Sequence, residues 1–252
     1  MSGNERTQEA RLELNDAENR LARGEMEILG LMPNASNYTF LVEISSADAN
    51  VGEGRTLAVY KPEAGETPLW DFPEGTLGLR EVAAYEIARA LGRPDVPPTV
   101  LRDGPHGKGS VQLFIDFDPE QHFFTLRGTR LADFRSIALF DTIINNADRK
   151  AGHCLVDLDS RIWLIDHGVC FHAEPKLRTV IWDFAGDALN DDDLAALADL
   201  GGSLSSGELG ERLEGLLAPM ELDALAGRIE ALRADGTFPV PSSDRHFPWP
   251  PV

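Results

Sequence analysis

The spacing of hydrophobic and polar positions predicts a strand-rich first half of the chain. Residues 5–23 are highly charged and have helical spacing, which predicts a loosely attached N-terminal helix. The segment "EMEILGLMPNASNYTFLVEI" predicts two strands around a turn at "MPNASN", and "TLAVYKP" predicts a third that ends at Pro62. In "LGLREVAAYEIARALG" apolar residues recur at helical spacing and Gly92 is a natural C-cap. "VPPTVLRDG" and "GSVQLFIDF" predict two further strands.

The second half is predicted to be mainly helical. "RLADFRSIALFDTIINN" predicts an apolar helix, and "HCLVDLD" and "RIWLID" then predict a hairpin that turns at Asp159 and Ser160. Three segments between residues 190 and 235 start with capping residues or acids, which is typical of helices. The tail is rich in proline and has no regular period. The predicted domains are an N-terminal helical extension (1–24), a small lobe (25–118), a large lobe (119–240) and a Pro-rich tail (241–252).

Composition restricts the partners that the protein can have. The 252 residues are 42% hydrophobic and 26% charged, as in ordinary globular proteins, and the formal net charge is −19. Such a surface repels phosphate backbones, so no nucleic-acid partner is expected. No apolar run has the length of a membrane span and the N-terminus lacks an apolar signal segment, so we expect a cytoplasmic protein without integral membrane association. Cys154 and Cys170 have apolar neighbours, which predicts reduced core residues. The predominance of arginine over lysine is typical of a GC-rich bacterial source.

Ionisable residues follow one another in the order that a phosphoryl-transfer site requires. Lys61 ends a strand and Glu81 begins the following helix, whereas Asp148, His153 and Asp166 bracket the predicted hairpin. Phosphoryl transfer needs a cation on the nucleotide phosphates, an acid that fixes this cation, ligands for a metal ion and a carboxylate that orients the attacking hydroxyl. The ensemble supplies each of these groups.

Each of these residues also has a plainer interpretation. A lysine at a strand end is usually solvated, and an acid in the first turn of a helix complements the helix dipole. Aspartates commonly cap turns, as we expect of Asp157 and Asp159 in the hairpin. The segment from Asp166 to Gly168 is, on this interpretation, a simple turn after a strand. The functional prediction therefore depends on the order of the whole set.

Four segments together resemble a known family. These are "REVAAYEIARALGRPDVPPTV", "GSVQLFID", "NADRKAGH" and "LIDHGVCF". They resemble, in this order, the αC helix with its following strand, the strand entering the hinge, the catalytic loop and the metal-binding strand end of the atypical phosphatidylinositol 3-/4-kinase-like superfamily. This superfamily includes type II phosphatidylinositol 4-kinases, HipA-like kinases and secretory-pathway casein kinases, and the chain is most similar to its actinobacterial phosphatidylinositol-kinase-like branch. The resemblance covers roughly residues 25–185.

The resemblance implies a fold and a nucleotide site. The fold would be α+β and two-lobed, with a small antiparallel-sheet N-lobe that carries one αC-type helix and a mostly helical C-lobe. Lys61 would contact the α- and β-phosphates of ATP and pair with Glu81. Two loop residues, Ser36 and Asn37, would lie over the phosphates. Three residues would border the adenine through side chain or backbone, namely Gln112, Phe114 and Ile115.

The resemblance also implies a catalytic and metal-binding centre. Asp148 would orient and deprotonate the acceptor hydroxyl, and Asp166 would bind Mg²⁺. His153 occupies the position where the family usually has a metal-binding asparagine. Imidazole suits softer ions than Mg²⁺, so His153 is expected to favour Mn²⁺ or to weaken one metal site. The loop "MPNASN" also lacks the multiple glycines of a protein-kinase phosphate loop.

Three functions remain open at this point. The first is an ATP-dependent kinase that acts on a hydroxyl of a small molecule, a protein or a lipid, although the acidic composition disfavours a lipid. The second is a pseudokinase or nucleotide-binding regulator, a hypothesis that His153 favours. Its Pro-rich tail would then dock a protein partner. A variant of this hypothesis is an enzyme that transfers AMP. The third is a metal-dependent phosphohydrolase built on His153, His167 and His172 with Asp148 and Asp166, which leaves Lys61 and Glu81 unexplained.

Overall fold

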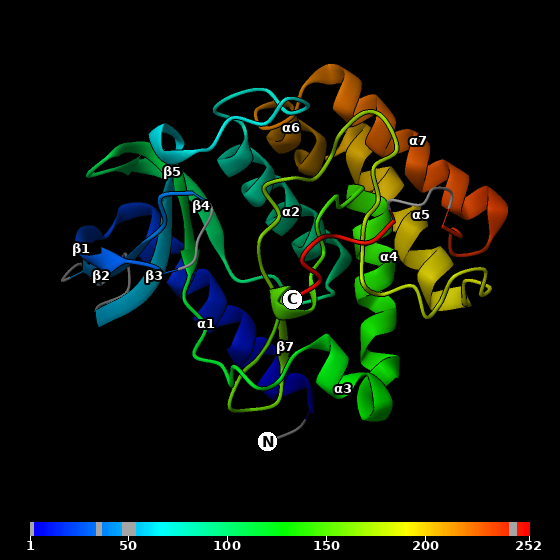
Figure 1. The fold of residues 1–252 in the computed structure, drawn as a ribbon, viewed down its shortest axis with the longest axis horizontal. Helices are drawn as coiled ribbons and strands as arrows, with labels where there is room; N and C mark the ends of the chain where they lie inside the picture. Colours follow the sequence, from blue (N-terminus) through cyan, green and yellow to red (C-terminus); the bar gives the residue numbers. More distant parts are fainter. Residues whose placement is uncertain (1–2, 34–36, 47–53, 242–245) are drawn as a thin grey trace. The chain divides into compact units, whose positions relative to one another are not determined.

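The chain divides into two compact units. The computed structural model describes residues 3–33, 37–46, 54–241 and 246–252. The first unit comprises the chain up to Val82 together with Pro97–Phe114, and the second comprises Ala83–Val96 and Ile115–Val252. Helix α2 (Leu77–Leu91) therefore belongs to both units (Figure 1). None of the helices in the described ranges is both long enough and apolar enough to cross a bilayer.

A five-stranded antiparallel sheet forms the centre of the first unit, with strand order β1-β2-β3-β5-β4 (Figure 1). Side chains of alternating positions point to one face, where Val42, Ile44, Ala58, Tyr60 and Val111 are fully buried. This alternation is the signal that predicted the strands. Their bounds are β1 (Glu25–Leu31), β2 (Phe40–Ser46), β3 (Gly54–Pro62), β4 (Thr99–Gly104) and β5 (Gly107–Leu113).

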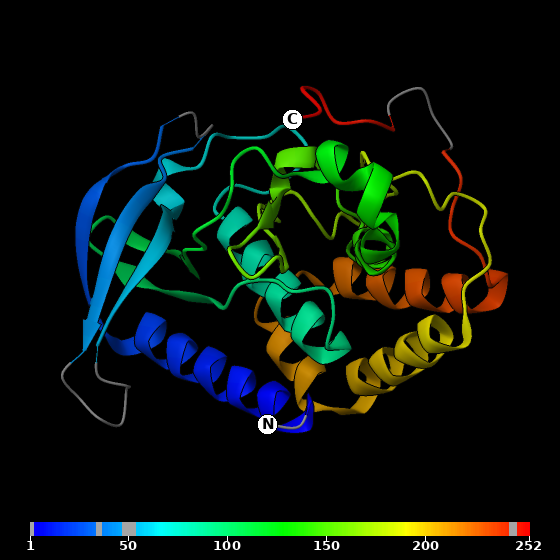
Figure 2. The same ribbon diagram turned by 90° about the horizontal axis from the view of Figure 1, so that it is seen from below.

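Helix α1 (Gly3–Arg23) is fixed to this sheet at its C-terminal end (Figures 1 and 2). Leu21 is fully buried in the same hydrophobic cluster as the sheet residues. Arg20 donates from Nε to Thr56 Oγ1 at 2.9 Å, and Arg102 donates from Nη1 to the carbonyls of Leu21 and Gly24 at 2.9 and 2.8 Å. The expectation of a loosely attached helix is therefore wrong, because the few apolar residues near the end of the helix pack fully against the strands.

Helix α2 follows a loop of residues 63–76 that begins with a 3₁₀ turn, η1 (Glu63–Gly65). The helix ends where it was predicted, and Gly92 adopts a left-handed φ of 70° just beyond it. Its second half supplies apolar side chains to the core of the second unit: Ala83, Ala84, Ile87 and Ala88.

Helices dominate the second unit, as predicted (Figure 2). The helix expected over residues 130–146 is shorter, because the chain forms α3, a 3₁₀ turn and α4 in succession around the buried side chain of Phe134. Three helices follow after residue 190, as predicted. Asn190 caps the first through its side chain, whereas Gly207 and Ala218, at the N-cap positions of the other two, make no side-chain cap. The bounds are α3 (Phe123–Arg130), η2 (Leu131–Phe134), α4 (Arg135–Ile144), α5 (Asp191–Ser206), α6 (Glu208–Glu214) and α7 (Pro219–Asp235).

The predicted hairpin is formed by β6 (Cys154–Val156) and β7 (Ile162–Leu164), all of whose residues are buried. Asp157 holds its turn, since Oδ1 accepts hydrogen bonds from the amides of Asp159 and Arg161 at 3.0 and 2.8 Å. Its Oδ2 accepts a further bond from Trp163 Nε1 at 2.7 Å. Asp157 is therefore a turn acid, as expected.

The two cysteines are buried thiols. Burial raises the pKa of Cys154 to about 12, although the neighbouring Arg149 guanidinium opposes this shift. A thiol with such a pKa stays protonated and unreactive, which agrees with the predicted core role.

The described part of the Pro-rich tail is bound to the second unit. The His246 carbonyl accepts hydrogen bonds from the amide of Thr179 at 3.1 Å and from Trp182 Nε1 at 3.0 Å. The Pro251 carbonyl accepts the amide of Ala151 at 2.8 Å, in the 3₁₀ turn η3 (Ala151–His153). Although the composition shows no period, backbone carbonyls thus hold residues 246–252 in place.

Candidate functional site

Lys61 and Glu81 form an ion pair in the first unit. The distance between Lys61 Nζ and Glu81 Oε1 is 2.5 Å. The Lys61 side chain is 25% exposed, whereas that of Glu81 is 3% exposed, so the lysine has access to solvent and the carboxylate does not. The buried acid thus fixes the position of an ammonium group that has access to solvent.

A glycine of β5 allows this strand to pair closely with the end of β3. Lys61 lies opposite Ser110 in the β3–β5 register, and the neighbouring Gly109 lies opposite Pro62. A Cβ atom at Gly109 would come within 2.4 Å of the Lys61 carbonyl oxygen. The start of α2 also lies against β5, since a Cβ atom at Gly78 would be in ordinary contact with the amide nitrogen of Ser110, at 3.4 Å. Glu81 follows Gly78 by one helical turn and therefore faces the end of β3.

Among the other residues predicted to bind nucleotide, the side chains of Asn37 and Gln112 are bonded to other protein groups. Ser36 lies outside the described residues. Asn37 Oδ1 accepts the amide of Thr67 at 2.8 Å, so its side chain is bound to the loop of residues 63–76. Gln112 is buried and donates from Nε2 to Thr99 Oγ1 at 2.8 Å. The Phe114 amide donates to the Leu57 carbonyl at 3.0 Å, which leaves the Phe114 carbonyl and the Ile115 backbone for the predicted hinge contacts.

The predicted catalytic loop follows α4 in the second unit. The helix ends at a left-handed residue, Asn145, whose φ is 52°. The Asn145 side-chain amide donates to the carbonyls of His172 and Glu174, each at 2.8 Å. Asn146 Oδ1 accepts the amide of Asp148 at 3.0 Å, in a turn that asparagine side chains commonly form. These bonds fix the backbone of the loop immediately before Asp148.

Arg149 fixes the backbone immediately after Asp148. Its guanidinium pairs with the carboxylate of Asp141 on α4, and both side chains are fully buried. The same guanidinium donates from Nη1 to the carbonyls of His153 and Ile165 at 3.4 and 3.1 Å. One buried cation thus joins α4, the catalytic loop and the residue that precedes Asp166.

The environment of Asp148 raises the pKa of its carboxyl group. Burial is the largest cause, and the nearby Asp166 carboxylate adds to it. Lys150, whose Nζ lies 3.3 Å from Asp148 Oδ2, opposes the shift by attraction and hydrogen bonding. A raised pKa makes a carboxylate a better proton acceptor, which is the property that a general base needs.

His153 and Asp166 are adjacent, as their predicted shared role requires. The distance between His153 Nε2 and Asp166 Oδ2 is 3.4 Å. The amide of Ile165 donates to the His153 carbonyl at 3.1 Å, so the hairpin returns the chain beside η3. His153 Nδ1 accepts the amide of Lys150 at 3.4 Å, which places the proton of a neutral imidazole on Nε2, toward Asp166. To bind a metal through Nε2, the ring would have to lose the proton that faces Asp166.

The donor set in the second unit fits a magnesium-type ion that is completed by a substrate. Within the described ranges, no three His, Cys, Asp or Glu side chains gather in a geometry that could hold a metal. Mg²⁺ commonly takes only one or two carboxylates and obtains its other oxygens from phosphates and water. The exposed carboxylate of Asp166 is a suitable ligand of this kind.

The three histidines of the phosphohydrolase hypothesis have separate surroundings. His167 is fully buried, with Nε2 2.8 Å from Arg149 Nη2, and His172 Nδ1 accepts the amide of Glu174 at 3.0 Å. Because the Arg149 nitrogen can only donate, His167 Nε2 is an acceptor for the guanidinium. These contacts give no support to a site built on the histidines.

Comparisons with known proteins identify relatives of the chain by sequence. No model of a known protein family matches the chain. Protein Rv2133c of Mycobacterium tuberculosis is 39% identical over 271 aligned positions, which cover 91% of this chain and 93% of that protein. The chain belongs to the Rv2133c family. A rice (Oryza sativa subsp. japonica) protein, phosphatidylinositol 4-kinase gamma 4, is 35% identical over 183 positions, which cover 58% of this chain but 31% of the rice protein.

Solved structures show which fold the chain adopts. The Helicobacter pylori proinflammatory kinase CtkA has a TM-score of 0.51 at 13% identity and covers 86% of this chain and 94% of its own. Hydra Fam20, solved with a sugar, has a TM-score of 0.57 at 13% identity and covers 89% of this chain and 88% of its own. The fold is therefore α+β and kinase-like, as the sequence resemblance implied.

Four residues that hold the catalytic loop were not predicted: Asp141, Asn145, Asn146 and Arg149. One signal was present in the sequence. Asp141 is a lone acid among the apolar residues of "SIALFDTII", and a charge at such a position is rarely buried unless it is paired. The sequence does not say which of the following arginines is its partner.

Proposed function

We propose that the chain is an ATP-dependent kinase that transfers the γ-phosphate to a hydroxyl of a small-molecule, protein or lipid acceptor. The observation that carries this proposal is the ion pair between solvent-accessible Lys61 and buried Glu81 in a kinase-like fold. This pair is the arrangement that protein kinases use to hold the nucleotide phosphates. The geometry around Asp148 supports the same conclusion, because its raised pKa suits a general base.

The proposed reaction assigns one task to each group. Lys61 attracts the α- and β-phosphates, while Glu81 keeps the ammonium group in position. Asp148 orients the acceptor hydroxyl and takes its proton as the oxygen attacks the γ-phosphorus. The bond from the γ-phosphorus to the bridging oxygen breaks, and ADP leaves with the electron pair.

We assign the metal to Asp166. A bound Mg²⁺ or Mn²⁺ would neutralise charge on the phosphates of the nucleotide. Asp166 supplies a carboxylate ligand, and His153, at 3.4 Å, either joins it as a ligand or donates a hydrogen bond that orients it. The His153→Asn experiment described in the Discussion distinguishes these two roles.

The acceptor class follows in part from charge. The similarity to the rice phosphatidylinositol 4-kinase supports placing the chain in a phosphatidylinositol-kinase-like branch of the superfamily, for which a lipid acceptor is one candidate. With a net charge of −19, however, the chain is repelled by anionic bilayers. A polybasic segment would contribute about 1 kcal/mol of attraction to the bilayer per basic residue, and the sequence has no polybasic run. We therefore place small-molecule and protein hydroxyls before lipid headgroups.

Calorimetry with ATP tests the proposal. Wild-type protein, Asp148→Ala and Asp166→Ala are titrated with ATP in the presence and absence of Mg²⁺ and Mn²⁺, and the γ-phosphate is followed in the same samples. We expect metal-dependent binding in the wild type and in Asp148→Ala, with turnover only in the wild type. Asp166→Ala should lose metal-dependent binding but keep its unfolding midpoint. Unchanged metal-dependent binding in Asp166→Ala would overturn the site assignment.

The contact between His153 and Asp166 favours a second candidate, a nucleotide-binding regulator that binds ATP without kinase turnover. The His153 ring lies 3.4 Å from the carboxylate that should hold the metal. ATP binding without γ-phosphate transfer to any acceptor of a broad hydroxyl panel would favour this candidate. If a label on the α-phosphate is transferred instead, the chain is an AMP transferase.

A further inference from the structure

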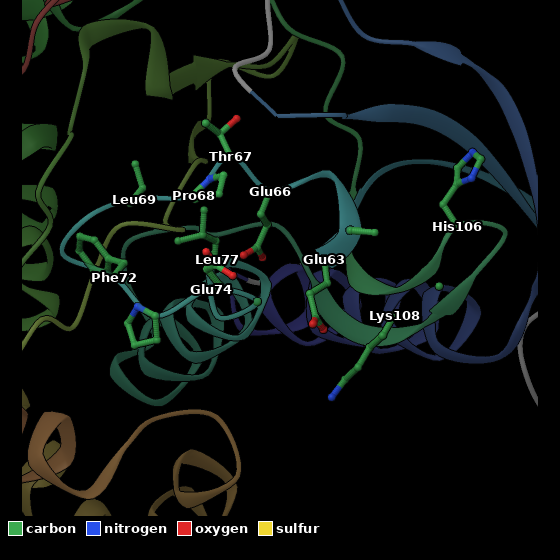
Figure 3. A pocket seen from close by; sticks show the side chains of 14 residues that line it. Glu63, Glu66, Thr67, Pro68, Leu69, Phe72, Glu74, Leu77, His106 and Lys108 are labelled. Carbon is green, nitrogen blue, oxygen red and sulfur yellow. The ribbon is translucent and has the colours of Figure 1, made fainter.

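A cavity of about 650 Å³ opens in the first unit, between the loop of residues 63–76 and the β4–β5 turn (Figure 3). This volume lies within the range of ordinary ligand sites. Its lining residues belong to that loop, to the first residue of α2 and to the β4–β5 turn. None of the proposed phosphoryl-transfer residues lines it.

The cavity combines three carboxylates with an apolar wall and one ammonium group. Glu63, Glu66 and Glu74 line it together with the apolar side chains of Leu69, Phe72 and Leu77, and the β4–β5 turn adds its basic lining residues, His106 and Lys108. The carboxylates outnumber the lysine, so the lining is acidic on balance. Glu66 is engaged, since its Oε1 accepts the amide of Gly78 at 3.1 Å and so caps the first turn of α2. Glu63 and Glu74 are exposed, and neither has an ion-pair partner within 4 Å among the described residues.

These contacts restrict the charge of an occupant. An anion at the start of α2 would compete with Glu66, which already binds the helix amide there, and would be repelled by the other two carboxylates. A metal ion is disfavoured as well, because no three acidic or other metal-binding side chains of the described residues gather closely enough to hold one. A cation whose donors are spread over several atoms, on an apolar stem, fits both the carboxylates and the wall.

The rim of the cavity indicates a macromolecular source for this cation. Trp70 is 91% exposed and Leu69 is 36% exposed, and both lie in the loop that forms one wall. Large exposed apolar side chains of this kind commonly anchor peptide partners, and a tryptophan face attracts guanidinium groups. The net charge of −19 also attracts a basic partner over long range. We propose that this cavity docks a short basic and apolar peptide segment, rich in arginine and leucine, of a protein partner.

The site is placed where its occupancy can matter. The loop of residues 63–76 joins the strand that ends at Lys61–Pro62 to the helix that carries Glu81. Glu66, near the start of this loop, binds the helix by accepting the amide of Gly78. Peptide binding as such is independent of the proposed kinase function, so the two fail separately. Only an effect of the peptide on turnover would depend on both.

Calorimetry on the full chain with three probes tests the inference. The probes are the capped peptide Arg-Leu-Arg-Leu, the capped peptide Glu-Leu-Glu-Leu, and agmatine, a small guanidinium compound without a peptide backbone. The protein variants are Glu63→Gln/Glu74→Gln and the matched control Glu25→Gln/Glu27→Gln, which removes two exposed carboxylates from β1 of the same unit. A third variant, Trp70→Ala, tests the rim.

We expect saturable binding of the basic peptide alone. Glu63→Gln/Glu74→Gln should weaken it about tenfold, as the loss of two exposed ion pairs predicts, while the β1 control changes it less than twofold. Trp70→Ala should also weaken it several-fold. The inference is overturned by the absence of saturable binding, by equal weakening in the control, or by agmatine binding as tightly as the peptide. Equal unfolding midpoints of the variants show that the fold is intact.

Discussion

Arg149 and Asp141 form a fully buried ion pair, with Nη2 2.9 Å from Oδ1, that joins the loop containing Asp148 to helix α4. The guanidinium also reaches the carbonyls of His153 and Ile165, which flank the hairpin returning to Asp166. Two proposed functional residues thus depend on one buried cation for their backbone positions. The Asp141 carboxylate balances the charge of this cation, and water has no access to either side chain.

Removal of Asp141 should destabilise the protein severely. We expect Asp141→Asn to lower the free energy of unfolding by about 3–5 kcal/mol, because the Arg149 charge is then left buried without a partner. Arg149→Lys keeps the charge but loses the planar fork that makes several bonds at once, and should also destabilise. Urea unfolding measures both. A loss below about 1 kcal/mol in Asp141→Asn would show that the guanidinium finds other compensation.

Lys61 and Glu81 should separate stability from activity. Lys61→Met removes the ion pair of the buried Glu81 carboxylate, so we expect a loss of about 1–3 kcal/mol in the free energy of unfolding. Lys61→Met/Glu81→Gln removes the buried charge as well and should recover most of that loss. Kinase turnover, if the proposed function holds, falls about 10²-fold in both variants. Recovery of turnover in the double variant would contradict the role of Lys61 on the phosphates.

Asp148 should show opposite effects on stability and turnover. Burial raises the pKa of its carboxyl group above the ordinary aspartate value, so the folded state disfavours the ionised form. The free energy of unfolding therefore decreases as pH rises from the unfolded pKa of about 3.9 through the raised pKa of Asp148 in the folded state. Asp148→Asn should therefore unfold at a higher temperature than wild type at pH 7, and at nearly the same temperature below about pH 3.9.

The same substitution should reduce turnover about 10²- to 10⁴-fold, since the acceptor hydroxyl loses its base. In the wild type, turnover should fall as pH decreases through the raised pKa of Asp148. A thermal unfolding series and a pH–rate profile measure the two effects. Destabilisation of Asp148→Asn at pH 7 would contradict the dominance of burial in this shift.

His153 should control the choice of metal. If its imidazole is a metal ligand, His153→Asn replaces nitrogen by a harder oxygen and should raise Mg²⁺ affinity relative to Mn²⁺ by about tenfold. If it only orients Asp166, the substitution weakens both metals equally. Metal titrations in the presence of ATP measure this ratio, and His106→Asn, an exposed histidine of the first unit, is the matched control. An unchanged affinity for both metals would exclude both roles.

Local patterns predicted the elements and the pair that depends on them. Alternation identified the strands, helical spacing and Gly92 identified α2, and the order of Lys61 and Glu81 indicated their contact. The attachment of α1 was not predicted, because it depends on hydrogen bonds from Arg102, 81 positions after Leu21. The partner of Asp141 and the orientation of Gln112 toward Thr99 were not predicted either, because burial and tertiary packing select them among several nearby polar groups.

The break between α3 and α4 had a different cause. Residues 131–134 have helical propensity, but the chain tightens into a 3₁₀ turn so that Phe134 can enter the core beside Phe123. Tertiary packing thus overrides a local preference. The turn role of Asp157 could be predicted because its hydrogen bonds reach only two to six residues along the chain.

The division of α2 between two units has a consequence for synthesis on the ribosome. When residue 96 leaves the exit tunnel, the second half of α2 presents Ala83, Ala84 and Ile87 with no core to enter, because that core is made from residues beyond 115. Strands β4 and β5 of the first unit also emerge after this helix. Neither unit can therefore complete its fold before synthesis of the other has begun. A nascent chain halted near residue 100 would contain no complete unit and would be a substrate for chaperones.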